Sequence, residues 1–159
     1  MELRKDSYCG LFCGACPFFI ENQNKQTLNK LYQKFSANNP DIQMEDLECS
    51  GCKSNNPSIY CKDCDIKNCA QNMNVEFCYQ CDHFPCSKLK KFRNDDSPHH
   101  SVILKNQETI KSIGIKNWLN NQKKRWSCDN CQTTFTWYTK VCPNCGNKLV
   151  TASDEEDLI

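Results

Sequence analysis

The sequence predicts a small α+β protein that is stabilised by bound metal, and three observations support this prediction. Fifteen of the 159 residues are cysteine, and most of them form C-x2-C pairs. Such a pair lets two thiolates turn toward one metal ion. The apolar content is low once cysteine is discounted, so metal coordination is expected to supply part of the folding free energy. Apolar residues at helical spacing and a β-branched, aromatic run complete the pattern.

Four regions follow from this reading. Residues 1–95 are expected to form a cysteine-rich zinc-knuckle domain with one amphipathic helix, and residues 96–125 a helical connector. Residues 126–150 are expected to form a β-hairpin zinc ribbon. Residues 151–159 form an acidic tail, and its run of acidic residues at 154–157 predicts disorder.

Metal is favoured over disulfide bonds for these cysteines. An odd number of cysteines leaves one thiol unpaired in any disulfide framework. The short N-terminal apolar stretch is broken by cysteine and Pro17, so it does not resemble a secretory signal. A cytoplasmic location, where thiols stay reduced, is therefore expected. The net charge of +1 indicates no global field that would attract nucleic acid or membrane, and no apolar run reaches the ~20 residues of a membrane helix.

The C-terminal region carries the most specific motif. Its cysteines read C-x2-C-x10-C-x2-C, and Pro143 and Gly146 suit the turn of a zinc knuckle. The run 133–139 between the pairs predicts a strand. Four thiolates close a tetrahedron around one zinc ion. A rubredoxin-like iron site is the rival, and the short hairpin and the lack of glycine after Cys131 favour zinc. The predicted ligands are Cys128, Cys131, Cys142 and Cys145.

Helices are predicted in two places. Leu28, Leu31, Tyr32 and Phe35 follow the i, i+3, i+4, i+7 pattern of an amphipathic helix that begins near Thr27 and ends before residues 38–40. Apolar residues at helical spacing predict two further helices over about 101–113 and 115–124, separated by a glycine.

Eleven cysteines crowd the first 86 residues and are expected to bind two or three zinc ions. Four C-x2-C pairs supply eight ligands, and His83 brings the candidates to twelve. The pair at 61 and 64 has a plausible partner on either side, so the spacing leaves the assignment of ligands to individual ions open. The candidates are Cys9, Cys13, Cys16, Cys49, Cys52, Cys61, Cys64, Cys69, Cys78, Cys81 and Cys86.

The first three of these cysteines have the C-x3-C-x2-C spacing of radical S-adenosylmethionine enzymes. Ala15 stands where that superfamily has an aromatic residue, and no repeated βα pattern follows. We therefore expect structural thiolates. An iron–sulfur cluster that serves in electron transfer, or in an enzyme, remains the alternative to zinc.

The cysteine motifs resemble those of a cysteine-rich family of prokaryotic proteins of unknown function, with the opening C-G-L-x-C-x-x-C-P. The C-terminal extension makes the chain similar to a longer version of that family. The resemblance implies a metal-binding, zinc-binding protein inside the cell, and it implies no reaction. His83 lies outside the family pattern.

Two functions compete on the sequence alone. The first is a zinc-stabilised module that binds protein or nucleic acid through aromatic and basic residues of the C-terminal region. The second is an iron–sulfur redox protein or cluster-dependent enzyme. The sequence offers no catalytic base, no nucleophile beyond the thiols, and neither a dinucleotide-binding nor a P-loop motif. It therefore favours the binding module over the enzyme.

Overall fold

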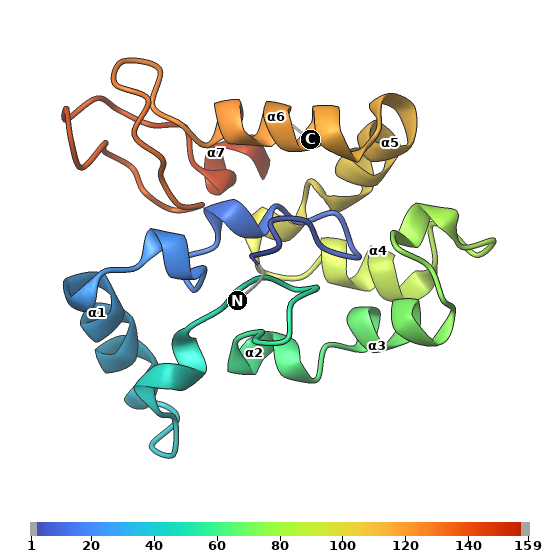
Figure 1. Cartoon of the computed structure of the whole chain (residues 1–159), viewed down its shortest axis with the longest axis horizontal. Helices are drawn as coiled ribbons and strands as arrows, with labels where there is room; N and C mark the ends of the chain where they lie inside the picture. Colours follow the sequence, from blue (N-terminus) through green and yellow to red (C-terminus); the bar gives the residue numbers. More distant parts are fainter. Residues whose placement is uncertain (1–2, 157–159) are drawn as a thin grey trace.

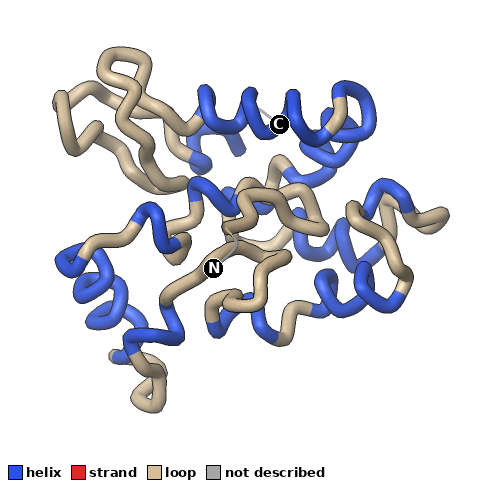
Figure 2. Tube along the Cα trace, in the orientation of Figure 1, coloured by secondary structure: helices blue, strands red, loops and turns tan. Residues whose placement is uncertain are grey.

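The computed structural model describes residues 3–156 and consists of helices and loops, with no named strand in that range. Figure 2 shows the same distribution along the chain. The α-helices are α1 (Lys25–Ser36), α2 (Ile59–Lys62), α3 (Asp65–Asn72), α4 (Ser87–Arg93), α5 (Ile103–Ile113), α6 (Ile115–Arg125) and α7 (Ala152–Glu156). The 3-10 helices are η1 (Cys13–Ala15), η2 (Ile20–Asn22), η3 (Met44–Leu47), η4 (Cys78–Gln80) and η5 (Pro98–His100).

The three predicted helices are confirmed. The first corresponds to α1 and begins at a capping box, in which the Asn24 side chain accepts from the backbone N–H groups of Gln26 and Thr27 at 3.0 and 2.9 Å. The other two correspond to α5 and α6, which Gly114 separates with a φ of 79°. None of the helices in residues 3–156 has the length and apolar composition that a membrane span requires.

The predicted C-terminal β-hairpin is wrong. In the segment 126–150, pairing is limited to two isolated antiparallel bridges, Ser127 with Thr134 and Val141 with Lys148. The backbone of the expected strand bonds elsewhere: the N–H of Trp137 donates to the carbonyl of Ala15 at 3.0 Å. Because Trp137 bonds to other parts of the chain and the pairing within the segment stops at single bridges, the segment folds as loops and the fold is largely helical.

The acidic tail also differs from expectation in its first half. Residues Ala152–Glu156 form α7, and the Thr151 hydroxyl and N–H both donate to the Asp154 carboxylate at 2.7 Å. This side-chain cap explains why the helix begins there, since it satisfies groups that the first turn leaves free. Residues 157–159 lie outside the described range.

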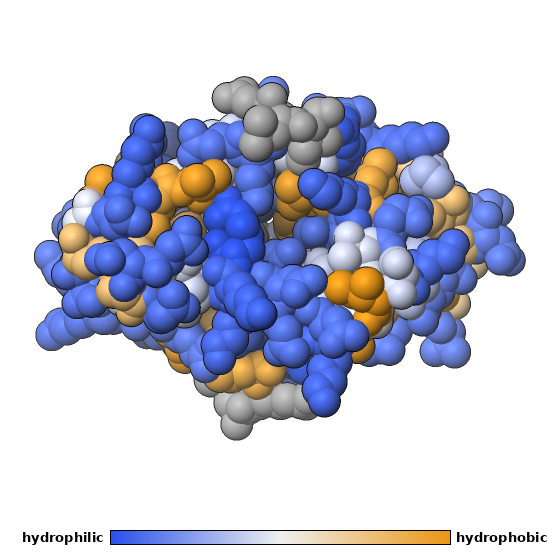
Figure 3. Space-filling model, turned by 90° about the horizontal axis from the view of Figure 1, so that it is seen from above, coloured by the Kyte–Doolittle hydropathy of each residue, from blue (hydrophilic) through white to orange (hydrophobic). Residues whose placement is uncertain are grey.

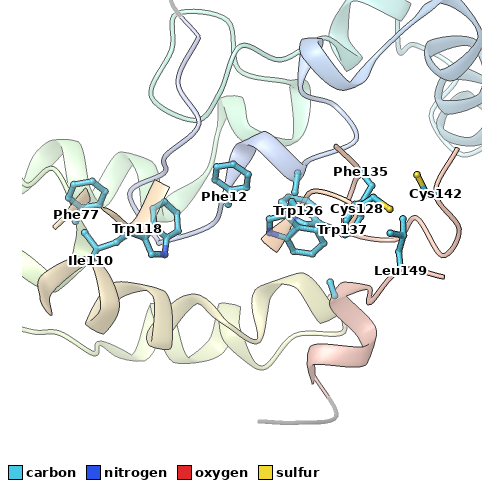
Figure 4. Close-up of a cluster of buried hydrophobic side chains, with 12 residues drawn as sticks. Phe12, Phe77, Ile110, Trp118, Trp126, Cys128, Phe135, Trp137, Cys142 and Leu149 are labelled. Atoms are coloured by element: carbon cyan, nitrogen blue, oxygen red, sulfur yellow. The ribbon is translucent and has the colours of Figure 1, made fainter. Parts of the chain in front are cut away.

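One hydrophobic core joins parts of the chain that are distant in sequence. The N-terminal segment runs between α1–α4 on one side and α5–α7 with the C-terminal loops on the other (Figure 1). The side chains of this core form a continuous row in the close-up (Figure 4). The core residues are Phe12, Ala15, Phe77, Ile110, Trp118, Trp126, Cys128, Phe135, Trp137, Cys142, Leu149 and Ala152.

The buried amide of Gln107 fixes α5 against the cysteine-rich part. Its Nε2 donates to the carbonyl of Tyr8 at 3.0 Å, and its Oε1 accepts from the N–H of Tyr79 at 2.8 Å. A second, smaller core lies beside it and consists of Cys9, Ile66, Cys78, Leu89 and Ile103. The connector therefore packs directly onto the cysteine-rich region.

Candidate metal centre

Four cysteines of the C-terminal segment meet at one point. The sulfur atoms of Cys128, Cys131, Cys142 and Cys145 all lie within 4.8 Å of one another. The closest pairs are Cys131 with Cys142 at 3.5 Å and Cys128 with Cys145 at 3.6 Å. Four thiolates at ~2.3 Å from one zinc ion would lie roughly 3.8 Å apart. These four thiols therefore have the geometry to hold one metal ion.

Two turns bring these thiols together, and each has a residue with a positive φ. Gly146 follows the second pair with a φ of 75°, as the knuckle sequence predicts. Gln132 follows the first pair with a φ of 59°, an uncommon value for a residue with a side chain. The first turn therefore forms without a glycine, because Gln132 adopts the left-handed conformation that Gly146 adopts in the second turn.

Hydrogen bonds lower the pKa of two thiols in this group, those of Cys131 and Cys145. The Thr133 side chain, and then that of Asn144, lower the pKa of Cys131 to about 5. The Asn130 side chain is the main cause of a lowered pKa at Cys145. The backbone N–H of Cys145 favours ionised Cys142, but burial and the neighbouring thiols outweigh it and raise that pKa to about 11. Metals bind the thiolate, so two of the four ligands are favoured in the form that binds.

The N-terminal cysteines are gathered less closely. Across residues 3–156, the C-terminal four are the one group of three or more Cys, His, Asp or Glu side chains whose ligand atoms all lie within 4.8 Å. None of the eleven N-terminal cysteines forms a disulfide bond. The structure thus provides one preformed four-thiol site, and the N-terminal ligand set stays a prediction.

One subset of the N-terminal cysteines shares a cavity of about 30 Å³ between α3, η4 and α4. Apart from His83 and Lys88, the rest of its wall is apolar. Burial, and after it the neighbouring thiols of Cys86, Cys69 and Cys81, raise the pKa of Cys78 to about 12. The four thiols that line this cavity are Cys69, Cys78, Cys81 and Cys86.

The thiols of Cys13 and Cys16 lie near those of later pairs. Burial raises the pKa of Cys16, and the thiols of Cys49 and Cys61 act in the same direction. Burial likewise raises the pKa of Cys13, with Cys52 as its first thiol neighbour. The opening cysteines therefore lie near the later pairs in space, although α1 separates them in sequence.

The knuckle at Cys49 shows why glycine occupies position 51. The backbone N–H of Gly51 donates to the sulfur of Cys49 at 3.3 Å. Its φ is 114°, and a Cβ at this position would lie 1.8 Å from the carbonyl oxygen of Arg4. Only glycine fits this turn, which directs a backbone donor at a thiol in the manner of a metal knuckle.

The aromatic residues of the C-terminal segment divide between core and surface. Trp126, Phe135 and Trp137 are buried, whereas the Tyr138 side chain is 43 % exposed. Sequence reasoning missed the role of Trp137, which stacks on His99 with ring centroids 4.0 Å apart. The rings of His99 and His100 are both partly buried, and burial lowers the pKa of His99 to about 3.

Comparison with known proteins assigns the N-terminal part of the chain to a protein family. The model of a family described as protein of unknown function, DUF3795, matches residues 5–91, which is more than half of the chain. All eleven N-terminal cysteines fall within this match, and the C-terminal four fall outside it. No curated protein and no solved structure matched the chain. The chain is a cysteine-rich member of the DUF3795 family, whose function is unknown, with a tetracysteine group beyond the matched region.

Proposed function

We propose that this chain is a zinc protein and that its C-terminal tetracysteine site is structural. The observation that carries the proposal is the meeting of four sulfur atoms within 4.8 Å. Four thiolates around zinc leave no open position for a substrate, so the ion would cross-link two turns and supply no reactive ligand. The segment has no hairpin to hold these turns together, which makes such a cross-link a reasonable source of its folding free energy.

A second zinc is proposed for the cavity lined by Cys69, Cys78, Cys81 and Cys86. These residues come from one C-x2-C pair and two single cysteines, so four thiolates are again available. The other seven N-terminal thiols would hold one or two further ions, which gives two or three in this region. His83 lines the same cavity, but it is not needed to complete four ligands.

The proposed role of the metal-stabilised fold is to bind a protein or a nucleic acid. The C-terminal segment exposes several apolar side chains, with Tyr138 at 43 %, Val141 at 56 % and Val150 at 55 %. Lys140 and Lys148 are exposed in the same segment. Exposed apolar and basic side chains within one segment are typical of macromolecular contact sites.

Metal analysis of the whole protein, purified without oxygen, tests this proposal. Zinc without iron or labile sulfide is expected. Cys86→Ser should lower the zinc content by one ion, whereas His83→Ala, at the same cavity, should leave it unchanged. Iron with stoichiometric labile sulfide would favour the iron–sulfur alternative for the N-terminal cysteines.

A further inference from the structure

A cavity of about 280 Å³ lies between the α5–α6 pair and the C-terminal part of the chain. Helices α5 and α6 provide one wall, and Phe12, Trp137 and α7 provide the opposite wall. Seen from the α6 side, the molecular surface is hollowed near its centre (Figure 3). This volume is near the lower end of the range for sites that bind small organic ligands, roughly 300 to 1,000 Å³. None of the cysteines lines this cavity.

The wall of this cavity contains a buried donor that lacks an acceptor. The Trp118 side chain lines the cavity and is 1 % exposed, and its Nε1 has no hydrogen-bond partner among the described residues. Buried N–H groups are nearly always paired, because an unpaired one has lost its bond to water and gained none in the protein. A ligand with an acceptor atom in the cavity would supply the missing bond.

Two amide side chains add further hydrogen-bonding capacity at the same place. Asn106 uses its Nδ2 to donate to the carbonyl of Gly10 at 2.9 Å, so its Oδ1 stays available as an acceptor. Gln122 uses its Oε1 to accept from Trp126 Nε1 at 3.2 Å, so its Nε2 stays available as a donor. Both residues line the cavity, which therefore presents donors and an acceptor together. Nucleobase edges carry the same mixture of donors and acceptors.

The remaining walls suit a flat, uncharged ring. Phe12, Trp126 and Trp137 are buried aromatic residues of the lining. The His99 ring, which burial holds in its neutral form with a pKa of about 3, lies against Trp137. Bases of every kind stack on aromatic side chains, because each base has a flat π face.

One cation at the rim is available for an anionic group. Arg125 is occupied, because it pairs with Glu155 and also donates to the carbonyl of Val150. Lys105 is exposed, lines the cavity, and makes no ion pair with any residue from 3 to 156. A lysine ammonium binds phosphate as a point charge. The cavity therefore combines a base-sized apolar interior with a single positive charge at its mouth.

We propose that this cavity binds one nucleotide, with the base beside Trp118 and the phosphate at Lys105. A ring carbonyl or ring nitrogen accepts from Trp118 Nε1, while Asn106 and Gln122 contact the rest of the base edge. The nucleotide comes either free or as the end of a single strand, since both present a base beside a phosphate. The inference goes beyond the proposed zinc sites, because none of the residues that it names is a predicted metal ligand.

Nuclear magnetic resonance of the zinc-loaded, full-length protein tests the inference. Indole N–H resonances are followed during titration with the four nucleoside 5′-monophosphates. The Trp118 resonance, assigned from Trp118→Phe, should move progressively with at least one of them. The matching nucleoside should bind at least several-fold more weakly, because it lacks the phosphate. A five-residue RNA with the same terminal base should bind more tightly than the monophosphate if the natural ligand is a strand end, and no more tightly if it is a free nucleotide.

Matched variants separate the cavity from the rest of the surface. Lys105→Gln should weaken monophosphate binding about tenfold, while Lys111→Gln, on the same helix and outside the cavity, should leave it unchanged. Thr109→Phe should block binding by filling the cavity without removing any of the proposed contacts. Zinc content is measured in every variant, so failure of the metal proposal is seen separately. Absence of any Trp118 shift at millimolar nucleotide, or an equal shift with ribose 5-phosphate alone, would overturn the inference.

Discussion

The sulfur atom of Cys128 lies 3.6 Å from that of Cys145, although 17 positions separate the two residues. The loops between them are held by two single β-bridges and by contacts to other parts of the chain, such as the bond from Trp137 to Ala15. An ion at this point would therefore link turns that the backbone alone joins weakly. The free energy of unfolding should therefore depend on the conformation of these turns and on the contacts that the rest of the chain makes with them.

The first knuckle turn is expected to improve when Gln132 is replaced by glycine. The φ of 59° at this position disfavours side chains, so Gln132→Gly should relieve strain of about 1 kcal/mol. Gln132→Val should destabilise the protein, because a β-branched residue tolerates this conformation least. Denaturant unfolding of the zinc-loaded variants measures both effects. Equal stability of the glycine and valine variants would show that the turn is not left-handed.

The amide of Gln107 should be essential to the junction between α5 and the cysteine-rich region. Gln107→Leu leaves the carbonyl of Tyr8 and the N–H of Tyr79 without partners, so a loss of about 2 to 4 kcal/mol is expected. The neighbouring Glu108→Gln is the matched control, because Glu108 is exposed on the same helix. Chemical denaturation compares the two. A Gln107→Leu protein as stable as the control would contradict the assigned hydrogen bonds.

A buried ion pair beside the cysteine-rich region should make stability sensitive to acid. Lys53 Nζ lies 2.7 Å from Asp6 Oδ2, and both side chains are less than a tenth exposed. Burial alone would raise the pKa of Asp6, but hydrogen bonds and charge from Lys53 and Arg4 leave it lowered. The contribution of this lowered pKa is complete above the unfolded value of about 4 and is lost as pH falls through the folded value.

Removing the cation tests this ion pair. Lys53→Met leaves a buried carboxylate without its main partner, so a loss of about 3 to 5 kcal/mol at pH 7 is expected. Because burial then raises the pKa of Asp6, lowering the pH should cost this variant less stability than it costs the unmodified protein. Lys62→Met removes the exposed partner of Asp46 and should cost no more than about 1 kcal/mol. Unfolding curves between pH 3 and pH 8 measure both variants, and identical pH profiles for Lys53→Met and the unmodified protein would refute the assignment.

Sequence periodicity predicted the helices correctly because the apolar residues that form the periodic pattern are also the ones that pack in the core. The apolar spacing of 101–113 and 115–124 places Ile103, Ile110 and Trp118 in the core, and a glycine separates the two helices as predicted. The spacing of the C-terminal cysteines predicted their meeting for a similar reason, since a C-x2-C pair brings both of its thiols to the same side of a single turn.

The same reasoning failed for the run 133–139. In this run Phe135 and Trp137 are buried and Tyr138 is exposed, a pattern that a strand could also have produced. The predicted partner strand does not form, and the backbone of Trp137 bonds to Ala15 and Ala152 instead. Strand propensity describes a side-chain pattern that loops on a core can also satisfy. Likewise, the orphan Trp118 donor and the cavity beside it arise from tertiary packing, which no local pattern encodes.

Native mass spectrometry of Cys142→Ser, compared with the unmodified protein, tests the central claim most directly. We expect the variant to carry one zinc ion fewer, because serine does not replace a soft thiolate ligand. The N-terminal ions should be retained, and a Cys131→Ser variant should lose the same single ion with no further loss when the two changes are combined. An unchanged metal content in Cys142→Ser would contradict a metal centre at Cys128, Cys131, Cys142 and Cys145.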